Sequence, residues 1–240
     1  MTAITLAPRG RSNEWLTHTR ALTVRNLMHI RREPMQLSDA TIQPVLFTLL
    51  FVELFGSAMV IPGGGSYKDF AIGGMMVMNL TTASVGTAVG LSGDLHTGVV
   101  DRFRTLPLAR SAILAGRTLS DLLAAAMCGA IVLITGFVIG WRPDNGFLSV
   151  VGALGIGIAF SFALSWAMAC MGLLVSDPES AQATSFVTIF PLAFVSSAMV
   201  PTNGLPTVLR VIAEWNPVSS VAGAARHLMG NPNPAALSNS

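Results

Sequence analysis

Residues 70–91 read FAIGGMMVMNLTTASVGTAVGL, a run of 22 residues without a charged side chain. As an α-helix rising about 1.5 Å per residue, the run would be roughly 33 Å long, enough to cross a hydrocarbon core of about 30 Å. A strand of a membrane barrel would instead alternate apolar and polar residues over about ten positions. Because lipid offers the backbone no hydrogen-bond partners, the unbroken run predicts a membrane-spanning helix.

Four further apolar runs accompany this one, so the sequence predicts an all-α, polytopic membrane protein. The composition agrees, since 52% of the 240 residues are hydrophobic and only 11% are charged, against about 25% charged in ordinary soluble domains. The five spans are expected at about 41–61, 70–91, 118–140, 147–175 and 181–200.

The arginines set the predicted orientation of these spans. Of the 14 Lys and Arg residues, six lie in 1–40 and four in the loop 92–117. Two spans separate these segments, so both lie on one side, which the positive-inside rule identifies as the cytoplasm. We therefore expect a cytoplasmic N-terminal segment, a cytoplasmic loop at 92–117 and an extracellular segment at 201–240.

The chain carries no motif for binding ATP itself. A P-loop needs a lysine that follows glycine, in the pattern GxxxxGK[ST], whereas the chain's single lysine, Lys68, follows Tyr67. No GxSxG or HExxH pattern is present either, and the four histidines lie far apart. We expect no catalytic residues, no metal and no cofactor on this chain. If it is driven by ATP, another subunit must hold the ATP.

The loop contains a segment suited to protein contact. Residues 93–110 read GDLHTGVVDRFRTLPLAR. At helical spacing, Val99, Phe103 and Leu106 share one side, the charged residues point elsewhere, and Pro107 stops the helix. Such a short helix can insert apolar side chains into a groove on a soluble partner. A solvated loop whose arginines only fix the topology is an alternative that the pattern leaves open.

The same segment resembles the coupling segment of ABC type-2 permeases, in the branch of the daunorubicin/doxorubicin-resistance permeases. Two later stretches are also similar to that family: AFVSSAMVP at 193–201, and NPV at 216–218 followed by Arg226 and Gly230. The residues of the ATPase-coupling helix that carry the resemblance are Asp94, Gly98, Asp101, Arg102, Phe103, Arg104, Leu106 and Pro107.

The resemblance implies the fold of a type V exporter, a dimer of six-helix permeases in the bacterial inner membrane. The second permease is another copy or a paralogue, and an ATP-binding subunit holding ATP and Mg docks on the 94–106 helix. An interfacial helix is implied within 1–40. The family has a sixth span after the NPV stretch, whereas five spans are visible in this chain.

The implied function is export of hydrophobic or amphiphilic drugs and antibiotics. Lipid or glycolipid export is an alternative within the family. An ATP-independent channel or an intramembrane enzyme is the alternative outside it.

Four residues are candidates for a substrate path. A charge in a span costs on the order of 2.5–3.5 kcal/mol, so Glu53 is interpreted as a contact for a cationic amphiphile or as a neutral glutamate bonded to a neighbouring helix. Met75 and Asn79 share a methionine-rich face that suits varied apolar ligands, or simple packing. Pro191 removes a helical hydrogen bond, which fits a cavity lining or a plain kink.

Overall fold

The computed structural model describes residues 34–56, 59, 61, 66–98, 110–199 and 206–231, with side chains from Thr41 in the first helix and from Thr118 in the fourth. These residues form helices and connecting turns, with no strand among them. The helices are α2 (Pro34–Gly56), α3 (Tyr67–Ala83), α4 (Val85–His96), α6 (Arg110–Val138), α7 (Gly146–Leu174), α8 (Pro178–Phe194), α9 (Thr207–Trp215) and α10 (Pro217–Met229).

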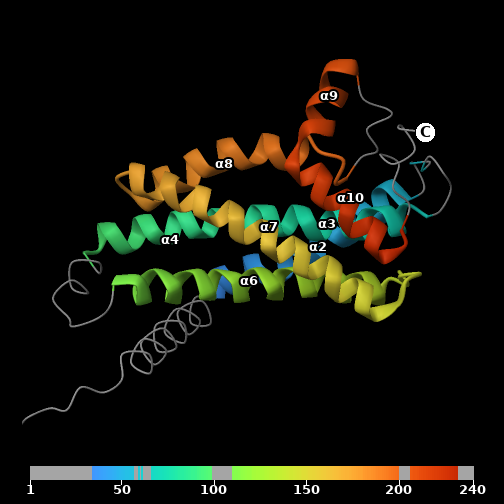
Figure 1. Cartoon of the computed structure of the whole chain (residues 1–240), viewed down its shortest axis with the longest axis horizontal. Helices are drawn as coiled ribbons and strands as arrows, with labels where there is room; N and C mark the ends of the chain where they lie inside the picture. The colour runs from blue at the N-terminus through green and yellow to red at the C-terminus, as the bar shows by residue number, and fades with distance from the viewer. Residues whose placement is uncertain are drawn as a thin grey trace, which may run out of the picture.

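The long helices lie side by side along one axis, and α9 projects from the side of the bundle (Figure 1). Helix α3 is central, because it packs against α2, α6, α7 and α10. At one end of the bundle α4 reaches Gly98 and α7 turns into α8; we call it the Gly98 end. At the other end α6 turns into α7 beside the last residues of α10; we call it the Arg142 end (Figure 1).

Helices α3 and α4 together form the long apolar helix expected from the opening run. The helix starts with a capping box, in which Ser66 Oγ accepts from the Lys68 amide and Asp69 Oδ2 accepts from the Ser66 amide, both at 3.3 Å. These bonds satisfy backbone donors that a helix start leaves unpaired. The stretch Tyr67–His96 is 30 residues long, which exceeds the length needed to cross a bilayer.

Three helices of the described part are long and apolar enough to span a membrane: Tyr67–His96, Thr118–Val138 and Gly146–Leu174. Helix α2 has 23 residues and α8 has 17. Together with the absence of strands among the described residues, this is the polytopic helical architecture that the sequence predicted.

Several boundaries differ from those expected. Helix α2 ends at Gly56, short of 61, and α6 begins at Arg110, within the segment expected as loop. Helix α8 ends at Phe194 rather than near 200. The segment expected to be extracellular contains α9 and α10, of 9 and 13 residues. At about 1.5 Å per residue neither is long enough to span a bilayer.

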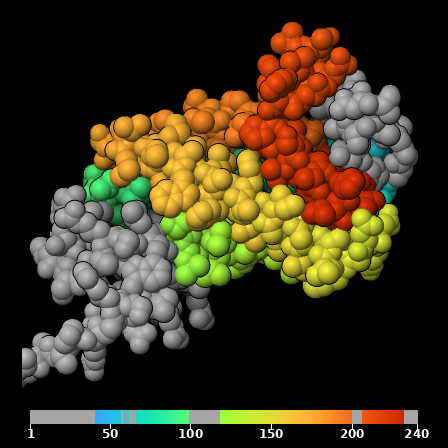
Figure 2. Space-filling view, in the orientation of Figure 1, coloured from blue at the N-terminus to red at the C-terminus, as the bar shows by residue number. Residues whose placement is uncertain are grey.

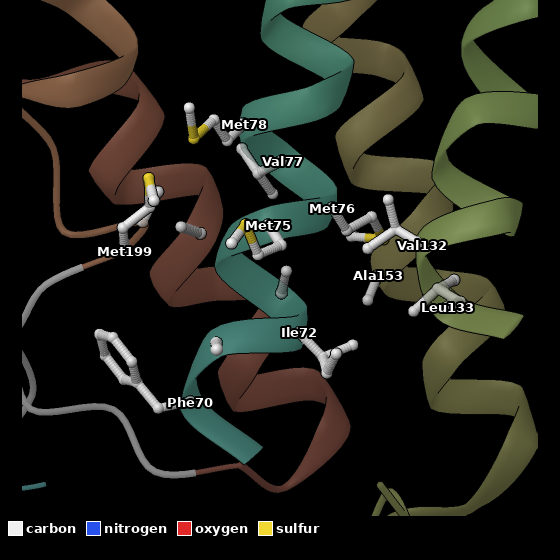
Figure 3. Packing of buried hydrophobic residues seen from close by; sticks show 14 of the residues in the cluster. Phe70, Ile72, Met75, Met76, Val77, Met78, Val132, Leu133, Ala153 and Met199 are labelled. Carbon is white, nitrogen blue, oxygen red and sulfur yellow. The ribbon is translucent and has the colours of Figure 1, made fainter. Parts of the chain in front are cut away.

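The core is built around α3. Figure 3 shows Met76 pointing toward Val132 of α6, while Met78 points to the other side of α3, where Met199 lies. All four side chains are buried. Flexible thioethers fill irregular gaps between helices of different orientation, so these methionines join the two sides of the bundle.

The outward sides of the helices are apolar. In Figure 2, α7 and α8 cover the face toward the viewer and α9 stands above it. Among the most exposed side chains are Leu148 at 83%, Leu174 at 87% and Val187 at 72%. Large apolar surfaces of this kind are unusual on soluble monomers, and they are the surface that a span presents to lipid or to another membrane subunit.

Candidate functional site

Helix α10 is fastened to the bundle at its start by Asn216. Its Oδ1 accepts from the Val218 amide at 2.9 Å, which caps α10, and Pro217 occupies the first helical position. Its Nδ2 donates to the carbonyls of Leu192 at 2.7 Å and Val195 at 2.6 Å, at the end of α8. One buried amide thus caps two helices at once and holds their ends together.

The middle of α10 is fastened by Arg226, whose side chain is fully buried. Its Nε donates to the Phe70 carbonyl at 2.8 Å, and Nη2 donates to those of Ser197 at 2.8 Å and Ala198 at 2.6 Å. The guanidinium carbon lies 3.7 Å from the centroid of the Phe70 ring, a cation–π contact. The described carboxylates form no ion pair with it, so carbonyl dipoles and the aromatic ring balance this charge.

Close approach at this point depends on Gly74. A methyl group added there would overlap the carbonyl oxygen of Ala198 and the Arg226 guanidinium. Tyr67, one turn before Phe70, adds a bond from its hydroxyl to the Met199 carbonyl at 3.1 Å. The start of α3, the turn after α8 and the middle of α10 therefore form one bonded unit.

The end of α10 is fastened by the turn between α6 and α7. The Asp144 amide donates to the Met229 carbonyl at 3.1 Å, and Asn145 Nδ2 donates to that of Leu228 at 2.9 Å. Gly230 has φ +76°, the left-handed conformation that ends a helix with least strain in glycine. We call these three attachments of α10, at Asn216, at Arg226 and at the carbonyls of Leu228 and Met229, the α10 anchor.

At the Gly98 end, the described part of the chain shows α4 packed on α7 and α8. Helix α4 closes with Asp94, half-buried, and Gly98, whose φ of +67° turns the chain out of the helix. Thr87 Oγ1 of α4 donates to Asp121 Oδ2 of α6 at 2.8 Å. The predicted coupling residues Asp101, Arg102, Phe103, Arg104, Leu106 and Pro107 lie outside the described residues.

The four predicted path residues do not meet at one place. Glu53 is exposed, and because α2 ends at Gly56 it lies in the last turn of that helix rather than in mid-span. Pro191 is exposed on α8. Met75 is buried in the core, and the half-buried Asn79 donates through Nδ2 to the Met75 carbonyl at 2.9 Å. Within one subunit, Met75 and Asn79 therefore lie together on α3, while Glu53 and Pro191 are exposed on α2 and α8.

Comparison with known proteins decides the family. Residues 17–229 match the family described as ABC-2 type transporter. The chain belongs to the ABC-2 type transporter family. As a member it is a permease, the membrane component of an ABC transporter, and the predicted resemblance to the ABC type-2 permeases is thereby confirmed.

Relatives of this permease carry names from drug resistance. A daunorubicin resistance ABC transporter permease protein, DrrB1 from Streptomyces coeruleorubidus, is 38% identical over 205 residues, or 85% of this chain and 72% of the relative. A probable doxorubicin resistance permease, DrrC from Mycobacterium tuberculosis, is 23% identical over 221 residues, covering 91% and 79%. A putative transport permease, ycf38 from Pyropia yezoensis, is 26% identical over 228 residues, covering 92% and 77%.

The α10 anchor was not among the predicted sites. Sequence reasoning gave Arg226 no role beyond its place in the segment expected to be extracellular, and the structure shows its side chain completely buried. A local signal did exist: Asn216-Pro217 is a helix start and Gly230 a helix stop, with Arg226 and His227 in the last turn. The contacts of Arg226 with α3 could not be seen, because Phe70 lies 156 positions earlier in the chain.

Proposed function

We propose that this permease is the transmembrane subunit of an ATP-driven exporter of hydrophobic or amphiphilic drugs. A separate nucleotide-binding subunit hydrolyses the ATP, and a second permease, a copy or a paralogue, completes the membrane pathway. The observation that carries the proposal is the family membership, with a 38% identical relative that is named for daunorubicin resistance. The single lysine lies outside any P-loop pattern, which fits an ATPase on another chain.

The docking site in this proposal is the segment from Asp94 to Leu106, with Phe103 and Leu106 entering a groove of the ATPase. The two helices that flank this segment meet it at the Gly98 end, where α4 ends and α6 begins. We assign this end to the cytoplasmic face of the bacterial inner membrane, from the arginines of the segment and of 1–40. Closure of the ATPase subunits would then move α4 and α6 before the other helices.

Co-purification tests the docking site. The tagged full-length chain is expressed in its native host and purified in detergent, and ATPase activity in the eluate is compared for wild type and Phe103→Asp/Leu106→Asp. The matched control is Val208→Asp/Val211→Asp, the same change on exposed residues of α9. We expect ATPase in wild type and control and its loss in the coupling variant. ATPase absent from all three samples would contradict the ATP-driven proposal and favour a channel or an intramembrane enzyme.

The substrate class is tested in inside-out vesicles. ATP-dependent uptake of daunorubicin is compared with ATP-dependent movement of a fluorescent phospholipid. Uptake of the drug alone supports drug export, and movement of the lipid alone supports the lipid alternative. In the proposed path, which runs between the two permeases, Glu53 would contact cationic substrates. Glu53→Gln should then reduce uptake of cationic daunorubicin but not of a neutral amphiphile, and equal loss of both would argue against this role.

A further inference from the structure

The helix Tyr67–His96 changes geometry near its middle, at Ser84. The Ser84 amide donates to the Thr81 carbonyl at 3.3 Å, and the Thr87 amide donates to that of Ser84 at 3.1 Å. These bonds join residues three apart, as in a 3₁₀-helix, and they separate α3 from α4. A stretch of 3₁₀ geometry inside a helix often marks a hinge, because its hydrogen bonds are less well aligned.

Hydroxyl groups concentrate just before this point. Ser84 Oγ donates to the Thr81 carbonyl at 2.6 Å, Thr81 Oγ1 to that of Val77 at 2.8 Å, and Thr82 Oγ1 to that of Asn79 at 3.0 Å. Each side chain competes for a carbonyl that the helix uses for its own ladder, which weakens and bends the helix. The three competing hydroxyls, of Thr81, Thr82 and Ser84, thus lie within about one turn of the helix.

The two halves of the helix differ in their neighbours. Helix α3 packs on α2, α6, α7 and α10, with a smaller contact to α8, and the α10 anchor holds its first turn. Helix α4 packs mainly on α7 and α8. Its contact with α7 is close, since a methyl group at Gly172 would come within 2.6 Å of the Ala88 carbonyl oxygen. Helix α4 therefore lies mainly against α7 and α8, and it lacks the extensive contacts to α2, α6 and α10 that hold α3.

The bond from Thr87 to Asp121 crosses between these two groups. Thr87 is buried on α4, three residues after Ser84, and Asp121 is half-buried on α6. Helix α6 packs on α2 and α3, and also on α7, which α4 contacts as well. While this hydrogen bond is formed, it restrains the angle between α4 and α6.

We propose that residues 81–84 form a hinge on which α4 tilts relative to α6, and that the Thr87–Asp121 bond is the latch that holds the closed position. The role of this device in transmitting ATPase motion rests on the proposed function. Helix α4 has 12 residues and is therefore about 18 Å long. A tilt of roughly 10° about Ser84 moves its far end, where the coupling segment begins, by about 3 Å.

Distances between spin labels test the hinge on the full-length chain alone in lipid nanodiscs, independently of any ATPase. One label pair reports α4 against α6, at His96→Cys and Leu119→Cys. A reference pair reports the anchored end, at Leu148→Cys on α7 and Ala224→Cys on α10. All four positions are exposed. Exposed Cys170 is replaced by serine, and Cys128 is buried.

The latch is removed with Thr87→Val, which keeps the shape of the side chain, and Thr87→Ser is the matched control that keeps the hydroxyl. We expect Thr87→Val to lengthen the α4–α6 distance by about 3 Å, for a tilt of roughly 10°, and to broaden its distribution. The control should match wild type, and the reference pair should not change. An unchanged α4–α6 distribution in Thr87→Val, with the reference pair intact, would overturn the latch.

The hinge is stiffened by adding Thr82→Ala and Ser84→Ala to Thr87→Val. With two of the three competing hydroxyls removed, the helix should straighten, and the α4–α6 distribution should narrow again. A distribution that stays as broad as in Thr87→Val would place the bending elsewhere and overturn the hinge. A changed α7–α10 reference distance would show that the triple variant disturbs the bundle itself. In that case the single variant Ser84→Ala tests the hinge. It should give a narrower α4–α6 distribution than wild type, and an unchanged distribution would overturn the hinge.

Discussion

The two ends of this permease are held together in different ways. At the Arg142 end, α10 is bonded through Asn216, Arg226 and the turn before α7 to three other parts of the bundle. At the Gly98 end, α4 meets α6 through the Thr87–Asp121 bond and follows a helix weakened by hydroxyl groups. This contrast, drawn from the described residues, accords with the proposed hinge, which places the adjustable end next to the segment proposed to receive the ATPase.

The largest effect is expected at Arg226. Arg226→Met leaves three carbonyls without their donor, and each bond to a charged group contributes about 1.5–3 kcal/mol. Removal of the buried charge recovers part of its desolvation cost. We expect a net loss of about 3–5 kcal/mol, seen as a lower melting temperature by tryptophan fluorescence in detergent. Arg210→Met is the control, because Arg210 makes an exposed 3.8 Å ion pair with Glu214 that is worth about 0–1 kcal/mol. Equal decreases in melting temperature for Arg226→Met and Arg210→Met would contradict the stabilising role of the buried arginine.

Two glycines sharpen the same contrast. Gly74→Ala places a methyl group on the Ala198 carbonyl and the Arg226 guanidinium, whereas a methyl group at Gly86, beside the hinge, meets no atom within 4 Å. We expect Gly74→Ala to destabilise by about 1–3 kcal/mol, as overpacking does. Gly86→Ala should be neutral or stabilising by up to about 1 kcal/mol through helix propensity. Melting temperatures of both variants test this expectation. An unchanged melting temperature for Gly74→Ala would show that the α10 anchor can accommodate the methyl group without loss of stability.

Two substitutions at Asn216 separate the contributions of its two capping bonds. Asn216→Asp keeps the acceptor for the Val218 amide but loses the donor to Leu192 and Val195, while Asn216→Ala loses both. We expect a loss of about 2 kcal/mol for the alanine and a larger loss for the aspartate, because its buried carboxylate would face the Leu192 and Val195 carbonyls in place of a donor; both are measured as melting temperatures at pH 7. An aspartate variant as stable as wild type would mean that the end of α8 does not depend on the amide.

The smallest effect is expected at the Gly98 end, at Asp177. Its Oδ1 accepts from the Ser180 amide at 2.8 Å at the start of α8. Hydrogen bonds from the Ser180 amide and hydroxyl lower the pKa of this exposed carboxyl below its usual value. Its contribution to stability is therefore present above the unfolded pKa of about 3.9 and is lost as the pH falls through the lower folded pKa. Asp177→Asn keeps an acceptor for the cap and should lose less stability than wild type between pH 5 and pH 3, in parallel melting curves. Identical pH profiles would show that this cap is not formed.

The sequence predicted the spans because a long unbroken apolar run can satisfy its backbone in lipid only as a helix, and it predicted the family from the coupling segment. It did not predict where α8 stops. The carbonyls after Phe194 are taken by Asn216 and Arg226, more than 20 positions later, so no local pattern marks that end. The charge rule counts charges and does not see tertiary contacts, so it could not show that Arg226 is buried against α3.

The path residues show the same limit. Met75 and Asn79 share a face of one helix, which spacing predicts, and the structure keeps them together. Whether Glu53 and Pro191 join them depends on packing between subunits, which the spacing of residues within one chain does not encode. The predicted path therefore remains a prediction about the assembled transporter.

The most direct test of the account compares both ends in the assembled transporter. The label pairs on α4–α6 and on α7–α10 are measured in the complex with its ATPase, without nucleotide and after trapping with ATP and vanadate. The account predicts that trapping shifts the α4–α6 distance and leaves the α7–α10 distance unchanged. An α7–α10 distance that shifts while the α4–α6 distance stays fixed would contradict it.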